Sequence, residues 1–202
     1  LDISQELDSI GAEYNAFTSK EYTGYYAKAA SENIDILLDV ISDIFQNSKF
    51  DEEEIAKEKG VIIEEINMYL DNPMRYIHEL FDDLLYGDQP AGWPIAGDKE
   101  IISNLKRENF VNYFNTHYLA KNTIVAVAGD IDENTIKNKA EKYFNNIRNG
   151  DKVEKLAVSE VQSEPKSKIF YKATDQSHFS LGVRAFNLFD ESNDIRLDKR
   201  FA

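Results

Sequence analysis

The 202-residue sequence contains no cysteine, and this absence excludes several kinds of chemistry. Disulfides, thiolate metal ligands and a cysteine nucleophile all need a sulfur atom that the chain does not have, while the redox compartment stays undecided. No apolar stretch approaches the roughly 20 residues that a membrane-spanning helix needs, and the chain shows no secretory signal. We therefore expect a soluble protein with no membrane span; its compartment stays open, with the cytoplasm favoured.

Basic residues are scarce relative to acidic ones. The chain has 23 Lys and Arg against 37 Asp and Glu, which gives a formal net charge of −14. Such a surface repels nucleic-acid backbones and anionic membranes, so we expect neither as a partner. A neutral or basic polypeptide would be attracted. The hydrophobic content of 42% is enough for a substantial core and argues against disorder.

Histidine is also rare, and its positions do not form a local metal site. The three residues, His78, His117 and His178, are 39 and 61 residues apart. His78 and Glu79 begin a stretch that resembles H-E-x-x-H, but Asp82 stands where the second histidine belongs. That motif binds zinc through two imidazoles one helical turn apart, so we interpret this stretch as a solvated helix face. Local patterns thus give no complete active site.

Residues 51–70 carry the clearest helical pattern in the chain. They open on acidic residues, extend for about five turns and place apolar residues at helical spacing. The expected apolar face consists of Ile55, Ile62, Ile66 and Tyr69. Glu64 points away from this face, whereas Glu58 and Glu65 fall on its flank, where a carboxylate is partly desolvated and still reaches a ligand. The alternative is that Glu58 and Glu65 are ordinary solvated acids in an acidic chain.

The remaining pattern predicts an α+β fold with helices layered on a largely antiparallel sheet. The expected helices cover residues 1–10, 31–46, 74–86, 98–118 in two pieces, and 133–147. The expected strands cover 12–19 and 22–30 as an antiparallel hairpin, 123–128 as a buried strand, 168–173 and 178–186. Residues 149–166 are polar and typical of a linker.

Three stretches, taken together, match one known pattern. Residues 11–26 read GAEYNAFTSKEYTGYY, residues 58–65 read EKGVIIEE, and residues 115–129 run from NTHY to AVAG. In this order and spacing they resemble the pitrilysin/insulinase-type zinc peptidases, the inverzincin family that includes mitochondrial processing peptidase. The resemblance covers most of residues 1–186.

This resemblance implies roles for particular residues. Glu65 corresponds to the third zinc ligand, and Glu58 to the acid that orients the site. Asn15, Ala16, Phe17 and Thr18 correspond to the edge strand on which such enzymes hold an extended peptide. Binding of this kind uses main-chain hydrogen bonds and reads side chains loosely, so the implied substrate is a peptide or unfolded polypeptide. The alternative for this strand is an ordinary place in the core.

The sequence departs from the family in one important respect. The family's H-x-x-E-H motif supplies two histidine ligands and the glutamate that activates the zinc-bound water, and it does not occur in the 64 residues before Glu65. By the family pattern it falls before Leu1. Family members also pair two similar domains in a clamshell, so we expect a missing second domain or partner subunit. We accordingly expect residues 1–186 to be an N-terminal-type domain truncated at its start, and 187–202 a tail leading into the remainder.

Three hypotheses follow. The first is that the intact protein is a zinc endopeptidase of which this chain alone is inactive. The second is a family relative that kept the fold as a binding or structural subunit without the active site. The third is an unrelated acidic α+β protein, which predicts that Glu58 and Glu65 lie far from residues 15–18. The presence of H-x-x-E-H in the codons before Leu1 separates the first hypothesis from the second.

Overall fold

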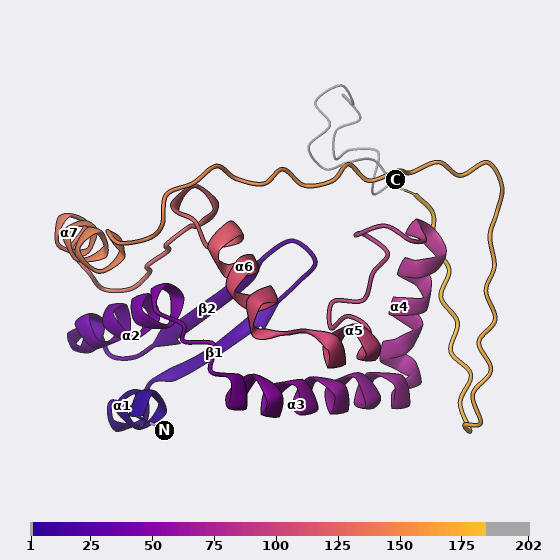
Figure 1. Ribbon diagram of the computed structural model, residues 1–202, viewed down its shortest axis with the longest axis horizontal. Coiled ribbons are helices and arrows are strands. Elements are labelled where there is room, and N and C mark those ends of the chain that lie inside the picture. The colour runs from indigo at the N-terminus through magenta and orange to yellow at the C-terminus, as the bar shows by residue number, and fades with distance from the viewer. Residues whose placement is uncertain (1, 185–202) are drawn as a thin grey trace.

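The computed structural model describes residues 2–184, which fold into helices around one hairpin (Figure 1). The helices of this range are α1 (Asp2–Ser9), α2 (Ile34–Gln46), α3 (Glu52–Asp71), α4 (Pro73–Tyr86), α5 (Lys99–Asn104), α6 (Arg107–His117) and α7 (Glu133–Phe144). Two short 3-10 turns lie at Ser31–Asn33 and Ala120–Asn122. The strands are β1 (Glu13–Thr18) and β2 (Thr23–Lys28). The predicted α+β class is confirmed.

The hairpin forms as the alternating pattern predicted. β1 and β2 pair antiparallel, from Glu13 opposite Lys28 to Thr18 opposite Thr23. The ring of Phe17 lies across Gly24, its cross-strand neighbour, so closely that a Cβ at position 24 would sit 2.3 Å from the ring. The missing side chain of glycine therefore makes room for an aromatic ring on this face of the hairpin.

The core lies between α1, α2 and the base of the hairpin. Leu7, Leu37 and Val40 are its buried members, and Leu7 is only 1% exposed. Partly buried side chains from β2 and the segment after it, Ala27 and Ala29, pack against them. Since fully burying a leucine side chain contributes on the order of 2 kcal/mol, these residues stabilise the attachment of the hairpin to α2.

A second, aromatic cluster surrounds Phe114 of α6. The Phe114 ring lies 5.1 Å from Phe50 and 4.8 Å from Tyr118, measured between ring centroids. The Arg148 guanidinium lies 4.0 Å above the same ring, a cation–π arrangement. This cluster joins the segment before α3, helix α6 and the chain that follows α7.

Helix α3 begins where the sequence predicted, and residues outside the helix form hydrogen bonds with it. The Asp51 carboxylate caps its first turn by accepting hydrogen bonds from the backbone N–H groups of Glu53 and Glu54, at 3.0 and 3.3 Å. Lys59 of α3 donates to the carbonyl of Leu105, just after α5, at 2.9 Å. No α3 residue is fully buried, because its apolar side is only half covered by α4 and α5.

Three predicted strands do not form within the described residues. Segments 123–128 and 168–173, and the described part of 178–186, run without strand pairing, and residues 185 and 186 lie outside the described range. Ile124, predicted to be buried, is 93% exposed. The physical reason is that a strand needs the N–H and C=O groups of a neighbour, and none of the described segments offers them here.

The start of α2 also differs from prediction. Residues 31–33 form a 3-10 turn, so the α-helix begins at Ile34 rather than at residue 31. Among the described residues, no helix is both long and apolar enough to cross a membrane.

Candidate functional site

The predicted peptide-binding residues lie along an exposed strand. All six residues of β1 are exposed, and the sheet of the described range contains β1 and β2 only, so the outer edge of β1 has no partner strand there. Asn15 and Phe17 share one face of the hairpin, while Ala16 and Thr18 share the other, as the register requires. The structure thus brings these four residues together on one open edge.

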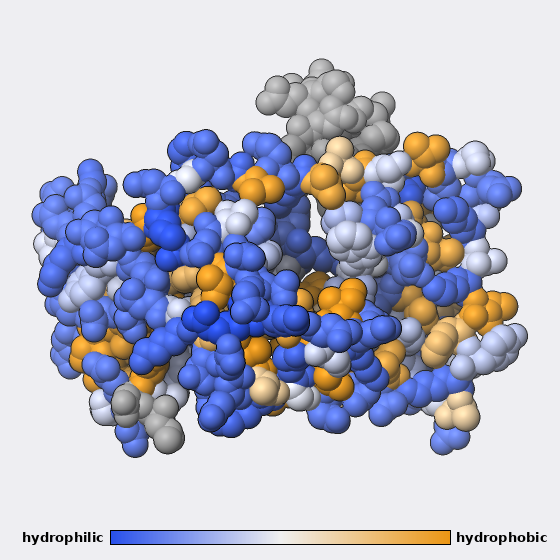
Figure 2. Space-filling model, in the orientation of Figure 1, coloured by the Kyte–Doolittle hydropathy of each residue, from blue (hydrophilic) through white to orange (hydrophobic). Residues whose placement is uncertain are grey.

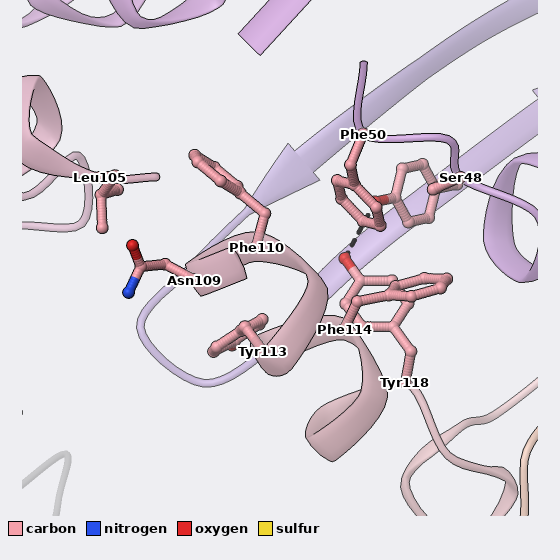
Figure 3. A pocket seen from close by; sticks show the side chains of 9 residues that line it. Ser48, Phe50, Leu105, Asn109, Phe110, Tyr113, Phe114 and Tyr118 are labelled. Carbon is pink, nitrogen blue, oxygen red and sulfur yellow. Dashed lines mark hydrogen bonds between the residues drawn. The ribbon is translucent and has the colours of Figure 1, made fainter. Parts of the chain in front are cut away.

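An apolar pocket adjoins the other strand of the hairpin (Figure 3). Its volume is about 440 Å³. Its lining consists of Tyr25, Ser48, Phe50, Leu105, Asn109, Phe110, Tyr113, Phe114 and Tyr118. The hydroxyl groups of Tyr25 and Tyr118 are 3.0 Å apart and hydrogen-bonded. Burial, reinforced by this hydrogen bond, raises the pKa of Tyr118 well above its ordinary value, so the Tyr118 phenol stays protonated at neutral pH.

This pocket was not predicted from the sequence. Its walls come from β2, the segment before α3, and α6, which lie far apart in the chain. The spacing of Phe110, Tyr113 and Phe114 is a signal that could have indicated an apolar helix face, but it does not say which segment packs against that face.

A second hollow, of about 560 Å³, lies at the turn of the hairpin. Residues 18–23 form one wall, and residues 90, 93–95 and 152–155 contribute to the others. Lys20, at the tip of the turn, belongs to this lining and forms an ion pair with Asp82 of α4.

The acidic residues of α3 are in place on the helix but are not distinguished by burial. Glu58, Glu64 and Glu65 are all exposed, whereas Ile62 and Ile66 are half-buried, as predicted for the apolar face. Tyr69, predicted to belong to the same face, is instead 39% exposed. The expected contrast between a bordering Glu65 and a solvated Glu64 is therefore absent here, because the apolar side of α3 is itself incompletely covered. No ion pair within residues 2–184 involves Glu58 or Glu65. Their roles stay predictions.

The residues present do not by themselves fit a zinc ion. A catalytic zinc site uses three protein ligands and one open position. Within residues 2–184, no group of three or more His, Cys, Asp or Glu side chains is close enough to hold a metal. His78 and His117 lie in α4 and α6, and neither joins such a group.

The fold and the sequence define the class of protein: the chain belongs to the insulinase family of peptidases, peptidase family M16. Residues 1–99 match the family model described as insulinase (peptidase family M16), and residues 104–198 match the model described as peptidase M16 inactive domain. The resemblance drawn from the three sequence stretches is thereby confirmed.

Individual relatives support the same assignment. The zinc protease YmxG of Bacillus subtilis is 37% identical over 190 residues, 94% of this chain and 46% of that protein. The beta subunit of the mitochondrial-processing peptidase of Caenorhabditis elegans is 34% identical over 151 residues, 75% of this chain and 33% of the subunit. The chain spans less than half the length of these relatives.

A solved structure agrees with the fold. A protease from Helicobacter pylori superposes with a TM-score of 0.71 over 78% of this chain and 38% of that one, at 24% identity. At this identity the likeness shows the fold alone.

Proposed function

We propose that the intact protein is a zinc-dependent metalloendopeptidase that cleaves peptides and unfolded polypeptides, and that the substrate binds as an added strand on β1. The observation that carries this proposal is the open edge of β1, in a chain whose relatives include zinc proteases. An extended peptide could satisfy the free backbone groups of that edge without a particular sequence. The net charge of −14 favours neutral or basic substrates.

Within this proposal, Glu65 supplies one zinc ligand and Glu58 holds it in orientation. A carboxylate that binds a metal needs a neighbouring group to hold its orientation. Loss of such an orienting group typically costs about 10–100-fold in metal affinity or activity. In this proposal the remaining ligands come from outside the described residues, which do not complete the site by themselves.

We also propose that a second domain or partner subunit covers much of the exposed apolar surface. Side chains of the segment after α7 carry a large part of it: Leu156, Val161, Ile169, Tyr171, Phe179, Leu181 and Val183 are each more than 70% exposed. Apolar groups also show on the face seen in Figure 2, scattered among hydrophilic ones. An apolar surface of this extent is typical of a protein interface.

Glu65→Gln in the full-length protein tests the metal role, with Glu64→Gln as the matched control. Both residues are exposed glutamates on α3, one position apart, so each change removes one negative charge from similar surroundings. We expect Glu65→Gln to lower zinc content and reduce peptide cleavage by more than about 100-fold, while Glu64→Gln stays near wild type. Zinc is measured by elemental analysis and cleavage with an unfolded peptide. Equal behaviour of the two variants would remove Glu65 from the site.

A second candidate function is a non-catalytic subunit of the same family. It is favoured by the match of residues 104–198 to a family model described as an inactive domain. The full-length protein would then contain no H-x-x-E-H motif, hold no zinc and still bind unfolded peptides.

A further inference from the structure

The side chain of Lys20 leaves the hairpin turn and reaches two distant segments. Its Nζ donates to Asp82 Oδ2 of α4 and to the carbonyl oxygen of Ala91, each at 2.6 Å. These partners are 62 and 71 residues away in the sequence. The turn itself is closed by the Ser19 N–H, which donates to the Tyr22 carbonyl at 2.8 Å. One ammonium group therefore joins this hydrogen-bonded turn to a helix and a loop.

The carbonyl that Lys20 contacts belongs to a tightly folded loop. The Gly92 N–H donates to the Gln89 carbonyl at 2.8 Å. Gly92 also approaches Gly87 so closely that a Cβ at position 92 would lie 2.2 Å from the Gly87 carbonyl oxygen. A backbone atom does not move aside as a side chain does, so this loop needs glycine at position 92 and holds Ala91 in place.

The carboxylates around Lys20 are partly removed from water. The side chains of Lys20 and Asp82 are 31% and 38% exposed. Burial raises the pKa of Glu79, one helical turn before Asp82, while the positive charge of Lys20 opposes this rise. An ion pair in such surroundings is screened less by salt than a fully exposed one, and its geometry is better defined.

The hairpin needs such an attachment. Its base is fixed by the packing of Ala27 and Ala29 on the core, and the Tyr25 hydroxyl of β2 is hydrogen-bonded to that of Tyr118, but every residue of β1 is exposed. A two-stranded hairpin is only marginally stable by itself in water. The other ion pair at the turn, Lys155 with Glu21, is longer at 3.2 Å and its side chains are 63% and 74% exposed.

We propose that Lys20 is a positioning residue for substrate binding: it anchors the tip of the hairpin on α4 and the 87–92 loop, and so holds the edge of β1 ready for an extended peptide. This inference rests on the proposed function. If the edge of β1 is already held in its binding conformation, none of the binding free energy is used to order it. The anchor therefore affects peptide binding more than the chemical step.

The test is Lys20→Ala in the full-length protein, with Lys139→Ala as the matched control. Lys139 pairs with Asp35 and joins α7 to α2; its side chain is 29% exposed, close to that of Lys20. We expect Lys20→Ala to raise KM for an unfolded peptide about tenfold with kcat changed less than about twofold. We expect Lys139→Ala to lower the Tm without changing KM.

Amide hydrogen exchange provides a readout that does not need cleavage. Lys20→Ala should speed exchange about tenfold in residues 17–23, and leave α2 unchanged, because only local opening becomes easier. Lys20→Arg keeps the positive charge and its donors, so it should restore KM and exchange most of the way to wild type.

The outcomes separate this proposal from the proposed function. Unchanged exchange in residues 17–23 would overturn the anchor, and faster exchange with unchanged KM would overturn its link to substrate. If the wild-type protein cleaves no peptide, the peptidase proposal fails, and the dissociation constant of a fluorescent unfolded peptide replaces KM. A Kd equal in wild type and Lys20→Ala, or no binding by either, would then overturn the positioning role.

Discussion

Residues 2–146 and residues 147–184 differ completely in secondary structure, although both contain alternating apolar residues. The first part holds every helix and strand of the described chain, and the second holds none (Figure 1). A helix closes its hydrogen bonds within itself, whereas a strand depends on a neighbour. The comparison teaches that a strand-like pattern, such as that of residues 168–173, predicts a strand only where a neighbouring strand can pair with it.

The second part is attached mainly through long side chains. Lys172 donates to Asp71 at the end of α3, at 2.9 Å, and Arg184 donates to the carbonyl of Leu85 at 2.6 Å. Aromatic contacts are fewer; the Phe170 and Tyr76 rings meet edge to face at 5.2 Å. We therefore expect its attachment to be weak in this chain and stronger once a neighbour supplies strand pairing.

The largest expected contrast comes from removing one phenylalanine in each part. Phe114 is 6% exposed and Phe179 is 85% exposed. Phe114→Ala should lower the free energy of unfolding of this chain by about 3–5 kcal/mol, because it leaves a cavity in the aromatic cluster. Phe179→Ala should change it by less than about 0.5 kcal/mol. Urea unfolding measures both.

The same pair sharpens the comparison in the full-length protein. If a second domain or subunit covers residues 147–184, Phe179→Ala becomes costly there while remaining neutral in the 202-residue chain. Equal, small effects in both contexts would contradict the proposed cover.

A smaller effect is expected at the start of α3. Asp51→Ala removes the acceptor of two backbone N–H groups and should cost about 1 kcal/mol in unfolding free energy. Glu52→Ala, in the first turn but not capping, is the control and should cost less than about 0.5 kcal/mol. A cost at Asp51 no greater than at Glu52 would show that the cap is unimportant.

The smallest effect concerns the link between the two parts. The hydrogen bond from Lys172 holds the pKa of Asp71 below its ordinary value of 3.8. A lowered carboxyl pKa contributes stability above pH 3.8 that is lost as the pH falls through the folded value. In Lys172→Ala the Asp71 pKa should return toward 3.8, as NMR titration of the carboxyl carbon would measure. Lys121→Ala, which removes an exposed pair with Asp151, should leave it unchanged.

Elements governed by local signals could be predicted from the sequence. Asp51 followed by acids and regular apolar spacing predicted the start of α3, and the helix expected over residues 1–10 forms as Asp2–Ser9 before Gly11, whose φ is 63°. The hairpin followed from alternation across a short turn. Segment 123–128 could not be judged in this way, because its burial depends on strands that lie elsewhere.

The candidate site was predictable only in part. The edge residues 15–18 emerged together because they are consecutive in one strand. The contacts of Lys20 and the Tyr25–Tyr118 hydroxyl pair were not predicted. Each joins positions at least 62 residues apart, and no local sequence pattern indicates a contact over such a separation. Whether Glu65 binds a metal also depends on groups that the described residues do not supply.

The contact of Phe17 with Gly24 has an evolutionary consequence. Any larger residue at position 24 would displace the Phe17 ring, which now meets the Tyr22 ring edge to face at 5.9 Å. Homologous sequences should therefore change these two positions in concert, with a bulky residue at one accompanied by a small residue at the other. Such paired variation would make the facing surface of the hairpin a place where relatives diverge in shape while keeping the same backbone.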